Sequence, residues 1–369
     1  MDKLIRSYEQ TYGKPDTLIA LESEQGDASF HVAVKNPMRD QGMPESTITS
    51  LGLSALSDHD VELHIDVIGK RAKKAIEETG AFFYNFYQEL ITAKEITPGS
   101  IYRNVEVPGF DGMNAVVIVN KGYLEPEWLD PEKEAGRLMT IMPLFDEEAD
   151  ELERLPVTLR ELFLRKSQLP VADPKREKDS VVHLAVKRLW QNIADWYEEH
   201  KVKDAAQLIS ALKGKKTDAP AAALEKKLKI DLPEDFRASF NIVHERIAVG
   251  EYTLYDEKST VKTAADMNGL NAEGAFKKAQ KKVTKDTRLQ QVWWHEQWIP
   301  VAVNSYNDHI CIDMAPGKAG TPGQVISRYN DVGPDPTGHI CFYQWLDEYY
   351  KELKRGVYEV DEHGHILMK

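Results

Sequence analysis

One segment divides this sequence into two halves that must each build a core of their own. Residues 170–180 read PVADPKREKDS, and they combine two prolines with a cluster of charges and no apolar period. Such a composition is typical of the connection between domains. The length of 369 residues also exceeds what one hydrophobic core usually organises. We therefore predict two domains, residues 1–172 and residues 173–369.

The first half alternates between strand and helix patterns. Residues 61–67 (VELHIDV) place apolar side chains at every second position, which is typical of a half-buried strand. Residues 115–119 (AVVIV) are apolar throughout and indicate a strand covered on both faces. Between these strands, apolar residues recur at helical spacing over residues 72–90, although Gly80 interrupts the pattern. The pattern predicts a sheet packed against a helix.

A further strand is predicted over residues 138–142, and we expect Pro143 to end it. A helix then begins near Asp146, because acidic residues favour the first turn of a helix. The segment 145–153 (FDEEADELE) holds six carboxylates. It could steer a basic partner towards this chain. The alternative is a solvated helix face, which is the commoner role of a run of charges.

The second half predicts amphipathic helices over residues 180–212 and a core over residues 218–369. Within this core we predict three strands of an antiparallel meander, at residues 298–303, 309–313 and 324–329. Large side chains at helical spacing over residues 342–353 predict a final helix that packs on this sheet. Both domains are therefore predicted to be α+β, each a mixed, largely antiparallel sheet packed with helices.

The second half resembles the SUKH superfamily, which includes fungal cell-wall synthesis regulators and many bacterial immunity proteins. The stretches that carry the resemblance run in the family's order over roughly residues 180–369. They are ALEKKLKIDLPEDFRASF (223–240), VWWHEQWIPVAVNSYNDHICIDMAP (292–316), GQVISRYND (323–331) and the closing FYQWLDEYYKELKRGVYEVD. The Trp-Ile-Pro strand followed by the Cys-Ile-Asp strand is the best marker.

The first half resembles the suppressor-of-fused domain over about residues 15–170. It has TITSLGLSA at residues 47–55 followed by the VELHIDV strand, and MTIMPLFDEEADEL at residues 139–152. In bacteria both families are associated with polymorphic toxins. The two resemblances together imply a non-catalytic immunity protein that binds a cognate contact-dependent or secreted toxin and neutralises it. The alternatives are an intracellular regulatory scaffold linked to signalling or cell-wall synthesis, and an uncharacterised hydrolase.

Charge and composition limit the partner and the compartment. The net charge of −13 argues against nucleic acid as a ligand, since phosphate binding needs clustered Lys and Arg. It would favour a basic toxin, such as a nuclease, although acidic balance also serves solubility. No apolar run is long enough to span a membrane, and no secretory signal is evident. With two cysteines, Cys311 and Cys341, we expect a reduced, cytoplasmic protein.

The candidate partner-binding residues lie in and beside the predicted meander. Trp294, Asn304, Asp308 and Asp313 combine an aromatic ring, an amide and two carboxylates, and the loop at one strand end could face a partner. The alternative, which we favour for any single residue, is structural. Asp313, for example, could accept backbone donors of the following loop.

No catalytic residue, metal site or cofactor is predicted. The DEHGH segment at residues 361–365 places two histidines two positions apart, which is not the spacing of a helical zinc site. The glycines of GKAGTPG at residues 317–323 precede a strand and do not form a phosphate-binding loop. No nucleophile elbow occurs, and neither cysteine has a catalytic signature. The sequence predicts no enzyme activity.

Overall fold

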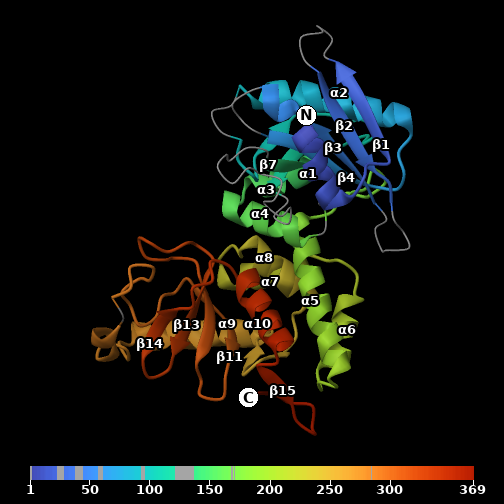
Figure 1. The fold of residues 1–369 in the computed structure, drawn as a ribbon. Helices are drawn as coiled ribbons and strands as arrows, with labels where there is room; N and C mark the ends of the chain where they lie inside the picture. Colours follow the sequence, from blue (N-terminus) through green and yellow to red (C-terminus); the bar gives the residue numbers. More distant parts are fainter. Residues whose placement is uncertain are drawn as a thin grey trace. The chain divides into compact units, whose positions relative to one another are not determined.

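The computed structural model describes residues 2–22, 29–37, 45–56, 61–92, 96–120, 137–167, 169, 171–283 and 285–369. The chain forms two compact units, residues 1–185 and 186–369. Each unit combines helices with a sheet that is mostly antiparallel, which confirms the predicted α+β class (Figure 1). Helix α5 (Val181–Glu199) begins in the first unit and continues into the second. A division into domains at residues 172 and 173 stays a prediction.

The described part of the first unit holds a sheet of eight strands, in the order β1-β2-β3-β4-β7-β6-β5, with β8 paired to β4. The pairing of β4 with β7 and with β8 is parallel, and the other pairs are antiparallel. The elements are α1 (Asp2–Tyr12), β1 (Thr17–Glu22), β2 (Ser29–Lys35), β3 (Glu45–Leu51), η2 (Leu53–Leu56), β4 (Val61–Ile68), α2 (Lys73–Leu90), β5 (Ile101–Arg103), β6 (Ala115–Asn120), β7 (Arg137–Leu144), α3 (Asp146–Glu153), α4 (Val157–Lys166) and β8 (Val171–Ala172).

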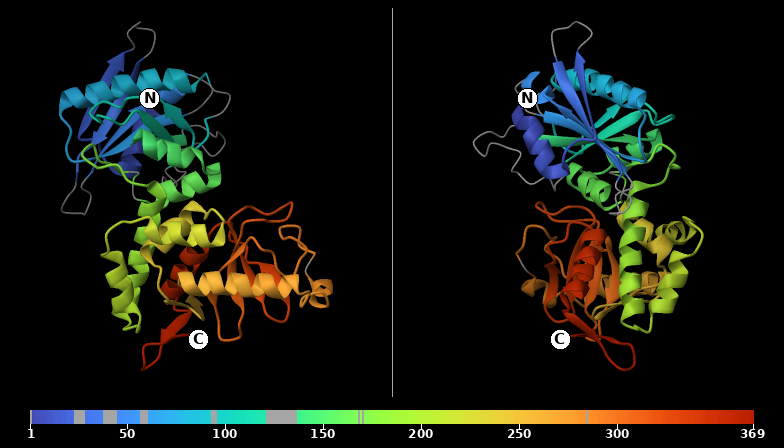
Figure 2. Two further views of the ribbon diagram at one scale, coloured as in Figure 1. Left: turned by 180° about the vertical axis from the view of Figure 1, so that it is seen from behind. Right: turned by 45° about the vertical axis from the view of Figure 1, so that its right-hand side comes forward.

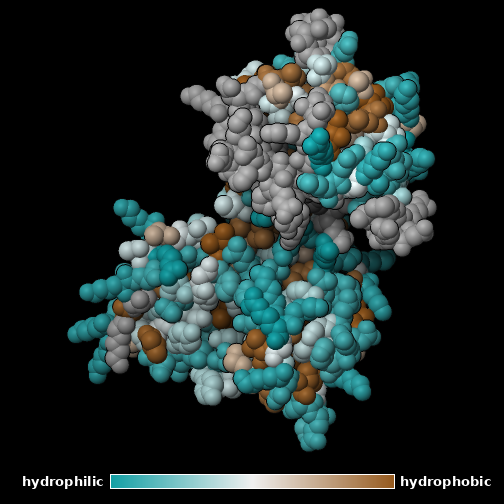
Figure 3. Space-filling model, in the orientation of Figure 1, coloured by the Kyte–Doolittle hydropathy of each residue, from teal (hydrophilic) through white to brown (hydrophobic). Residues whose placement is uncertain are grey.

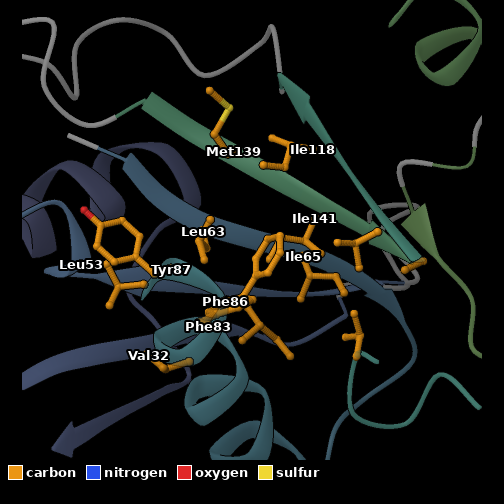
Figure 4. Packing of buried hydrophobic residues seen from close by; sticks show 14 of the residues in the cluster. Val32, Leu53, Leu63, Ile65, Phe83, Phe86, Tyr87, Ile118, Met139 and Ile141 are labelled. Carbon is orange, nitrogen blue, oxygen red and sulfur yellow. The ribbon is translucent and has the colours of Figure 1, made fainter. Parts of the chain in front are cut away.

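Helices α1 and α2 cover opposite faces of this sheet (Figure 2). The face under α2 carries the alternating apolar residues of β2 and β4, packed with Phe83, Phe86 and Tyr87 of the helix (Figure 4). Gly80 lets α2 approach the sheet closely, because a Cβ there would lie 2.2 Å from the Leu21 Cδ1 atom. The glycine that interrupts the helical pattern is therefore a packing requirement.

A buried carboxylate organises the TITSLGLSA segment. Glu62 on β4 is fully buried, and it accepts hydrogen bonds from the backbone N–H groups of Gly52 (2.8 Å) and Ser54 (3.1 Å). The hydroxyls of Ser50 and Ser54 also donate to it, at 2.5 and 2.7 Å. These donors compensate for the loss of water around the charge. The short helix η2 is thereby fixed against the end of β4.

The expected end of the strand at Pro143 is wrong, because β7 continues to Leu144 and pairs Pro143 with Val116 of β6. On its other side β7 pairs with β4 only as far as Thr140. A proline removes a hydrogen-bond donor, but this costs nothing where the neighbouring strand has already diverged.

The second unit is built on a six-stranded antiparallel sheet in the order β14-β13-β12-β11-β10-β9, with a separate β15–β16 hairpin near its C-terminus. The three strands predicted for the meander are confirmed with their bounds as β11, β12 and β13. The elements after α5 are α6 (Ala205–Leu212), α7 (Ala219–Leu228), α8 (Glu234–Ile242), β9 (Ala248–Val249), β10 (Tyr252–Leu254), α9 (Glu257–Ala272), η4 (Ala279–Lys282), β11 (Trp298–Val303), β12 (His309–Asp313), β13 (Gln324–Tyr329), β14 (Gly333–Pro336), α10 (Phe342–Arg355), β15 (Tyr358–Val360) and β16 (Ile366–Met368).

Helices α9 and α10 lie on opposite faces of the second sheet (Figures 1 and 2). Met267 of α9 packs with Trp294, Trp298, Cys311 and Ile326 in one buried cluster. On the other face, α10 carries the large side chains of the predicted final helix, and Phe342 packs edge-on against Phe236 of α8. The sheet is thus held from both sides and offers its strand ends to solvent.

The two helix glycines of α2 and α9 give a matched test of the packing. We expect Gly80→Ala to lower the free energy of unfolding by about 1 kcal/mol, because overpacking against Leu21 outweighs the gain in helix propensity. Gly269→Ala in α9, where an added Cβ meets nothing within 4 Å, should raise it by up to about 1 kcal/mol. Urea unfolding of both variants measures this. An equal stabilisation in both would contradict the close approach of α2.

Candidate partner-binding site

Three turns gather at one end of the second sheet. Strand pairing places the β9–β10 turn beside the β11–β12 turn, since Thr253 pairs with Val303. It places the β13–β14 turn on the other side, since His309 pairs with Arg328. We name residues 250–251, 304–308 and 330–332 the turn surface. It contains Asn304 and Asp308, two of the predicted partner-binding residues.

The β11–β12 turn is held in one conformation by its own side chains. Asn304 Oδ1 accepts the backbone N–H groups of Tyr306 and Asp308, both at 2.9 Å. Its Nδ2 donates to Asp308 Oδ2 at 3.2 Å, and Asn307 adopts the left-handed conformation (φ 63°) that the tight turn requires. Asp308 Oδ1 also accepts the backbone N–H of Asn330 at 2.8 Å. One carboxylate therefore joins two neighbouring turns.

Exposed apolar and acidic side chains stand on this rigid frame. Tyr306 is 75% exposed and Val332 is 62% exposed. Glu251 and Asp331 are exposed on the adjoining turns. Burial of Tyr252, together with the charges of Glu251 and Asp308, raises the pKa of its hydroxyl. The turn surface thus combines an exposed aromatic and an exposed aliphatic side chain with two exposed carboxylates.

Hydrophobic residues are also exposed elsewhere on the second unit, as at Leu367 (46% exposed) and Met368 (59% exposed). On the face drawn in Figure 3, residues 186–369 are mainly hydrophilic, with hydrophobic residues as scattered spots. Single exposed apolar residues are normal on a protein surface. Recognition of a partner by this unit would depend on a few anchoring side chains with a polar surround, as in many protein interfaces.

The other two predicted residues, Trp294 and Asp313, are buried. Trp294 is 1% exposed, and its Nε1 donates to Asn268 Oδ1 of α9 at 2.7 Å. Asp313 accepts hydrogen bonds from Trp298 Nε1 (3.0 Å), from Gln324 Nε2 (3.0 Å) and from the backbone N–H of Ala315 (2.9 Å). Their contacts here are those of the structural alternative. Whether any of the four residues contacts a partner stays a prediction.

A buried arginine on β13 is hydrogen-bonded to the turn surface through Asn330. Arg328 of β13 is 3% exposed, and its guanidinium lies 5.8 Å from the Phe276 ring and 5.9 Å from the Trp293 ring. On the neighbouring strand, His309 Nδ1 forms a hydrogen bond of 3.2 Å with the Tyr255 hydroxyl. Burial and the charge of Arg328 lower the pKa of His309 to about 4. His309 is therefore neutral at physiological pH.

The acidic segment 145–153 is engaged within the first unit. Arg103 of β5 lies 2.7 Å from Asp150, 2.8 Å from Glu153 and 3.7 Å from Asp146. Shared hydrogen bonds to Glu153 and Asp150, opposed in part by burial, raise the pKa of this guanidinium. Half of the carboxylates of α3 are therefore paired with one cation.

The remaining carboxylates of α3 hold the segment before α5. Glu147 pairs with Lys178, and Glu148 binds both terminal nitrogens of Arg176, with 2.6 Å between Nη2 and Oε2. Glu151 accepts the first backbone N–H of α5 at 2.7 Å, where the helix dipole favours a negative charge. The expectation that this segment attracts a basic partner stays a prediction, but its charges are already matched.

The remaining candidate chemistry concerns metal-binding side chains and thiols. Among them no group of three or more His, Cys, Asp or Glu side chains could hold a metal ion. His365 of the DEHGH segment bonds to Asp361 at 3.1 Å within a turn. Both cysteines are buried, and burial raises the pKa of each thiol. Among the described helices, none is both long and apolar enough to cross a membrane.

Sequence reasoning missed Tyr306 and Arg328. The sequence NSYND between two strands did signal a turn, and an aromatic residue at its centre could have been singled out as exposed. Arg328 carries no such signal, because an arginine at a strand end is expected to point into water. Only the positions of Phe276 and Trp293, 52 and 35 residues earlier in the chain, reveal its burial.

Comparison with known proteins identifies the family that the second unit matches. Residues 217–353 match the model of the SMI1 / KNR4 family (SUKH-1). A curated relative, the "Cell wall biosynthesis/cell cycle regulator smi1" of Schizosaccharomyces pombe, is 28% identical over 202 residues. That match covers 49% of this chain and 39% of the yeast protein, so this chain spans well under half of its relative. The predicted SUKH resemblance is confirmed for this region.

Solved structures of suppressor-of-fused proteins match the N-terminal half. A putative homolog from Neisseria gonorrhoeae matches with a TM-score of 0.36 and 11% identity, covering 49% of this chain and 95% of that chain. Drosophila Suppressor of Fused matches with a TM-score of 0.36 and 14% identity, covering 54% of each chain.

The structural role of Asp313 is tested by removing its carboxylate. We expect Asp313→Ala to lower the free energy of unfolding by about 3 kcal/mol, because it removes three hydrogen bonds and leaves Trp298 Nε1 buried without an acceptor. Asp331→Ala, at an exposed position of the turn surface, should change it by less than about 0.5 kcal/mol. Similar values for both variants in urea unfolding would show that Asp313 does not support the fold.

His309 predicts a pH dependence of stability. Its pKa is lowered from 6.5 to about 4 in the folded chain, so only the unfolded chain binds a proton between these pH values. Stability therefore falls as the pH falls through this window, by up to about 3 kcal/mol. His309→Asn, which keeps an acceptor for Tyr255, should show a flatter profile in urea unfolding from pH 4 to pH 7. Parallel profiles would contradict a neutral, buried imidazole.

Proposed function

We propose that this chain is a non-catalytic binding protein of the immunity type, which acts in the cytoplasm by binding a cognate toxin and blocking it. The turn surface of the second unit is the contact region. The observation that carries the proposal is the fixed β11–β12 turn, which holds the 75% exposed ring of Tyr306 away from the sheet. No step of catalysis is needed, because occlusion of the toxin suffices.

The turn favours binding in two ways, through its tyrosine and through its fixed conformation. Tyrosine is enriched among residues that dominate interface energies, since it combines a large apolar ring with a hydroxyl. A loop that is already fixed loses little conformational freedom when a partner binds. The bonds from Asn304 and Asp308 supply this fixation, so these two residues act by positioning Tyr306.

Charge indicates the kind of toxin. The chain has a net charge of −13, and Glu251 and Asp331 are exposed on the turn surface itself. Carboxylates that are not paired internally attract a basic partner over distances of about 10 Å at moderate salt. A basic toxin, such as a nuclease, fits this surface better than an acidic one. The acidic helix α3 contributes less, because its charges are paired.

The second candidate is an intracellular regulatory scaffold. The observation in its favour is the 28% identical relative from Schizosaccharomyces pombe, which is named a regulator of cell wall biosynthesis and the cell cycle. A scaffold could use the same turn surface. The two candidates differ in what the surface binds, so the identity of the bound protein distinguishes them.

The proposal predicts the effect of one substitution on binding. The tagged chain is purified from its native host, and the proteins it retains at low and moderate salt are identified by mass spectrometry. We expect the C-terminal domain of a large secreted toxin. Tyr306→Ala should then raise the Kd of the purified complex about thirtyfold or more, as for other central aromatic anchors.

The matched control is Leu18→Ala, which truncates an exposed apolar residue of the first unit (41% exposed). It should leave the Kd unchanged. A loss of binding with Leu18→Ala and none with Tyr306→Ala would place the interface on the first unit. If the chain retained only signalling proteins and protected its host against no toxin, the immunity proposal would be rejected in favour of the regulatory scaffold.

A further inference from the structure

Arg328 is a buried cation without a carboxylate partner. Of the described residues, none forms an ion pair with it, and its Nε atom is buried without a hydrogen-bond acceptor. Nη1 donates to Asn330 Oδ1, at the long distance of 3.3 Å. Asp308 contributes a negative charge at longer range, but its carboxylate is bound by Asn304 and by the backbone of Asn330.

This arrangement is costly for the isolated chain. Burial removes water from the guanidinium and lowers its pKa. The rings of Phe276 and Trp293 recover part of this loss through cation–π attraction. An arginine is best satisfied by the two oxygens of a carboxylate, which match its fork of donors. Among the residues that the structure describes, no carboxylate fills this role.

We propose that Arg328, between Phe276 and Trp293, is the binding site for a carboxylate side chain of the protein that docks on the turn surface. An Asp or Glu of the partner would take the place of the Asn330 amide and bind the guanidinium. This inference rests on the proposed function, because it assigns a specific contact to the same surface.

The location supports this assignment. Asn330, which accepts the hydrogen bond from Arg328 Nη1, belongs to the turn surface, and its backbone N–H is held by Asp308. Its side chain is exposed, so the amide can rotate into water and uncover Nη1. A partner whose basic surface faces Glu251 and Asp331 would insert one acid among its cations. A competitor without that acid would leave Arg328 unpaired, which gives specificity.

The test uses acetate as the minimal carboxylate and the full chain. The ¹H–¹⁵N signal of the Arg328 Nε–H, assigned by its loss in Arg328→Met, is followed by NMR while acetate replaces chloride at constant ionic strength. We expect a saturable shift with acetate. Asn330→Ala should bind acetate about twofold more tightly, since it removes a competing acceptor. Arg103, already paired with three carboxylates, should not respond.

Stability separates a binding role from a structural one. Arg328→Met keeps the packing between the rings and removes the charge, so its Tm should be unchanged or higher, as when buried ionic groups are replaced by apolar ones. Either an Arg328 signal that ignores acetate, or a Tm lowered by about 5 °C or more, would overturn the inference. A response to phosphate stronger than that to acetate would also overturn it.

These outcomes do not depend on the toxin. A carboxylate response together with unchanged partner binding in Tyr306→Ala would reject the turn surface as the contact region and leave carboxylate binding at Arg328 intact. A thirtyfold loss of partner affinity in Tyr306→Ala, without any response of Arg328 to acetate, would support the turn surface and reject the Arg328 site.

Discussion

The carboxylate of Asp308 is the interaction on which the turn surface depends. It accepts the Asn304 amide in its own turn and the backbone N–H of Asn330 in the next one. The first bond helps to fix the conformation that exposes Tyr306, and the second places Asn330 over Arg328. The half-buried carboxylate of Asp308 thus positions both the exposed Tyr306 and the Asn330 that binds Arg328. Below it, Asp313 and Trp298 tie the opposite ends of β11 and β12 together.

Negative charge has two separate uses in this chain. In the first unit, the carboxylates of α3 are paired with Arg103, Arg176, Lys178 and the N-terminus of α5, so they stabilise the fold. In the second unit, Glu251 and Asp331 remain exposed beside Tyr306. Net charge alone does not distinguish these uses, since it counts paired and unpaired groups equally. The local pairing shows which charges are available for an encounter with a basic protein.

Local patterns predicted the fold well where a short stretch determines the outcome. The helical spacing of α10 needed only neighbouring residues. The alternation in β4 predicted the strand itself, but the expected half-burial is wrong, because residues 61–67 are buried on both faces of the sheet. Pro143 was misjudged because its tolerance depends on where β4 diverges from β7, a long-range fact. The site followed the same rule: the turn around Asn304 was predicted from its sequence, whereas the burial of Arg328 depends on Phe276 and Trp293 from distant segments.

Hydrogen–deuterium exchange of the chain, alone and bound to the toxin domain captured from its host, tests the central claim most directly. Our account predicts slower exchange on binding at residues 304–308 and 330–332, with little change on the edge strand β1 (Thr17–Glu22). Protection confined to the first unit, with the three turns of the second sheet exchanging as in the free chain, would contradict it.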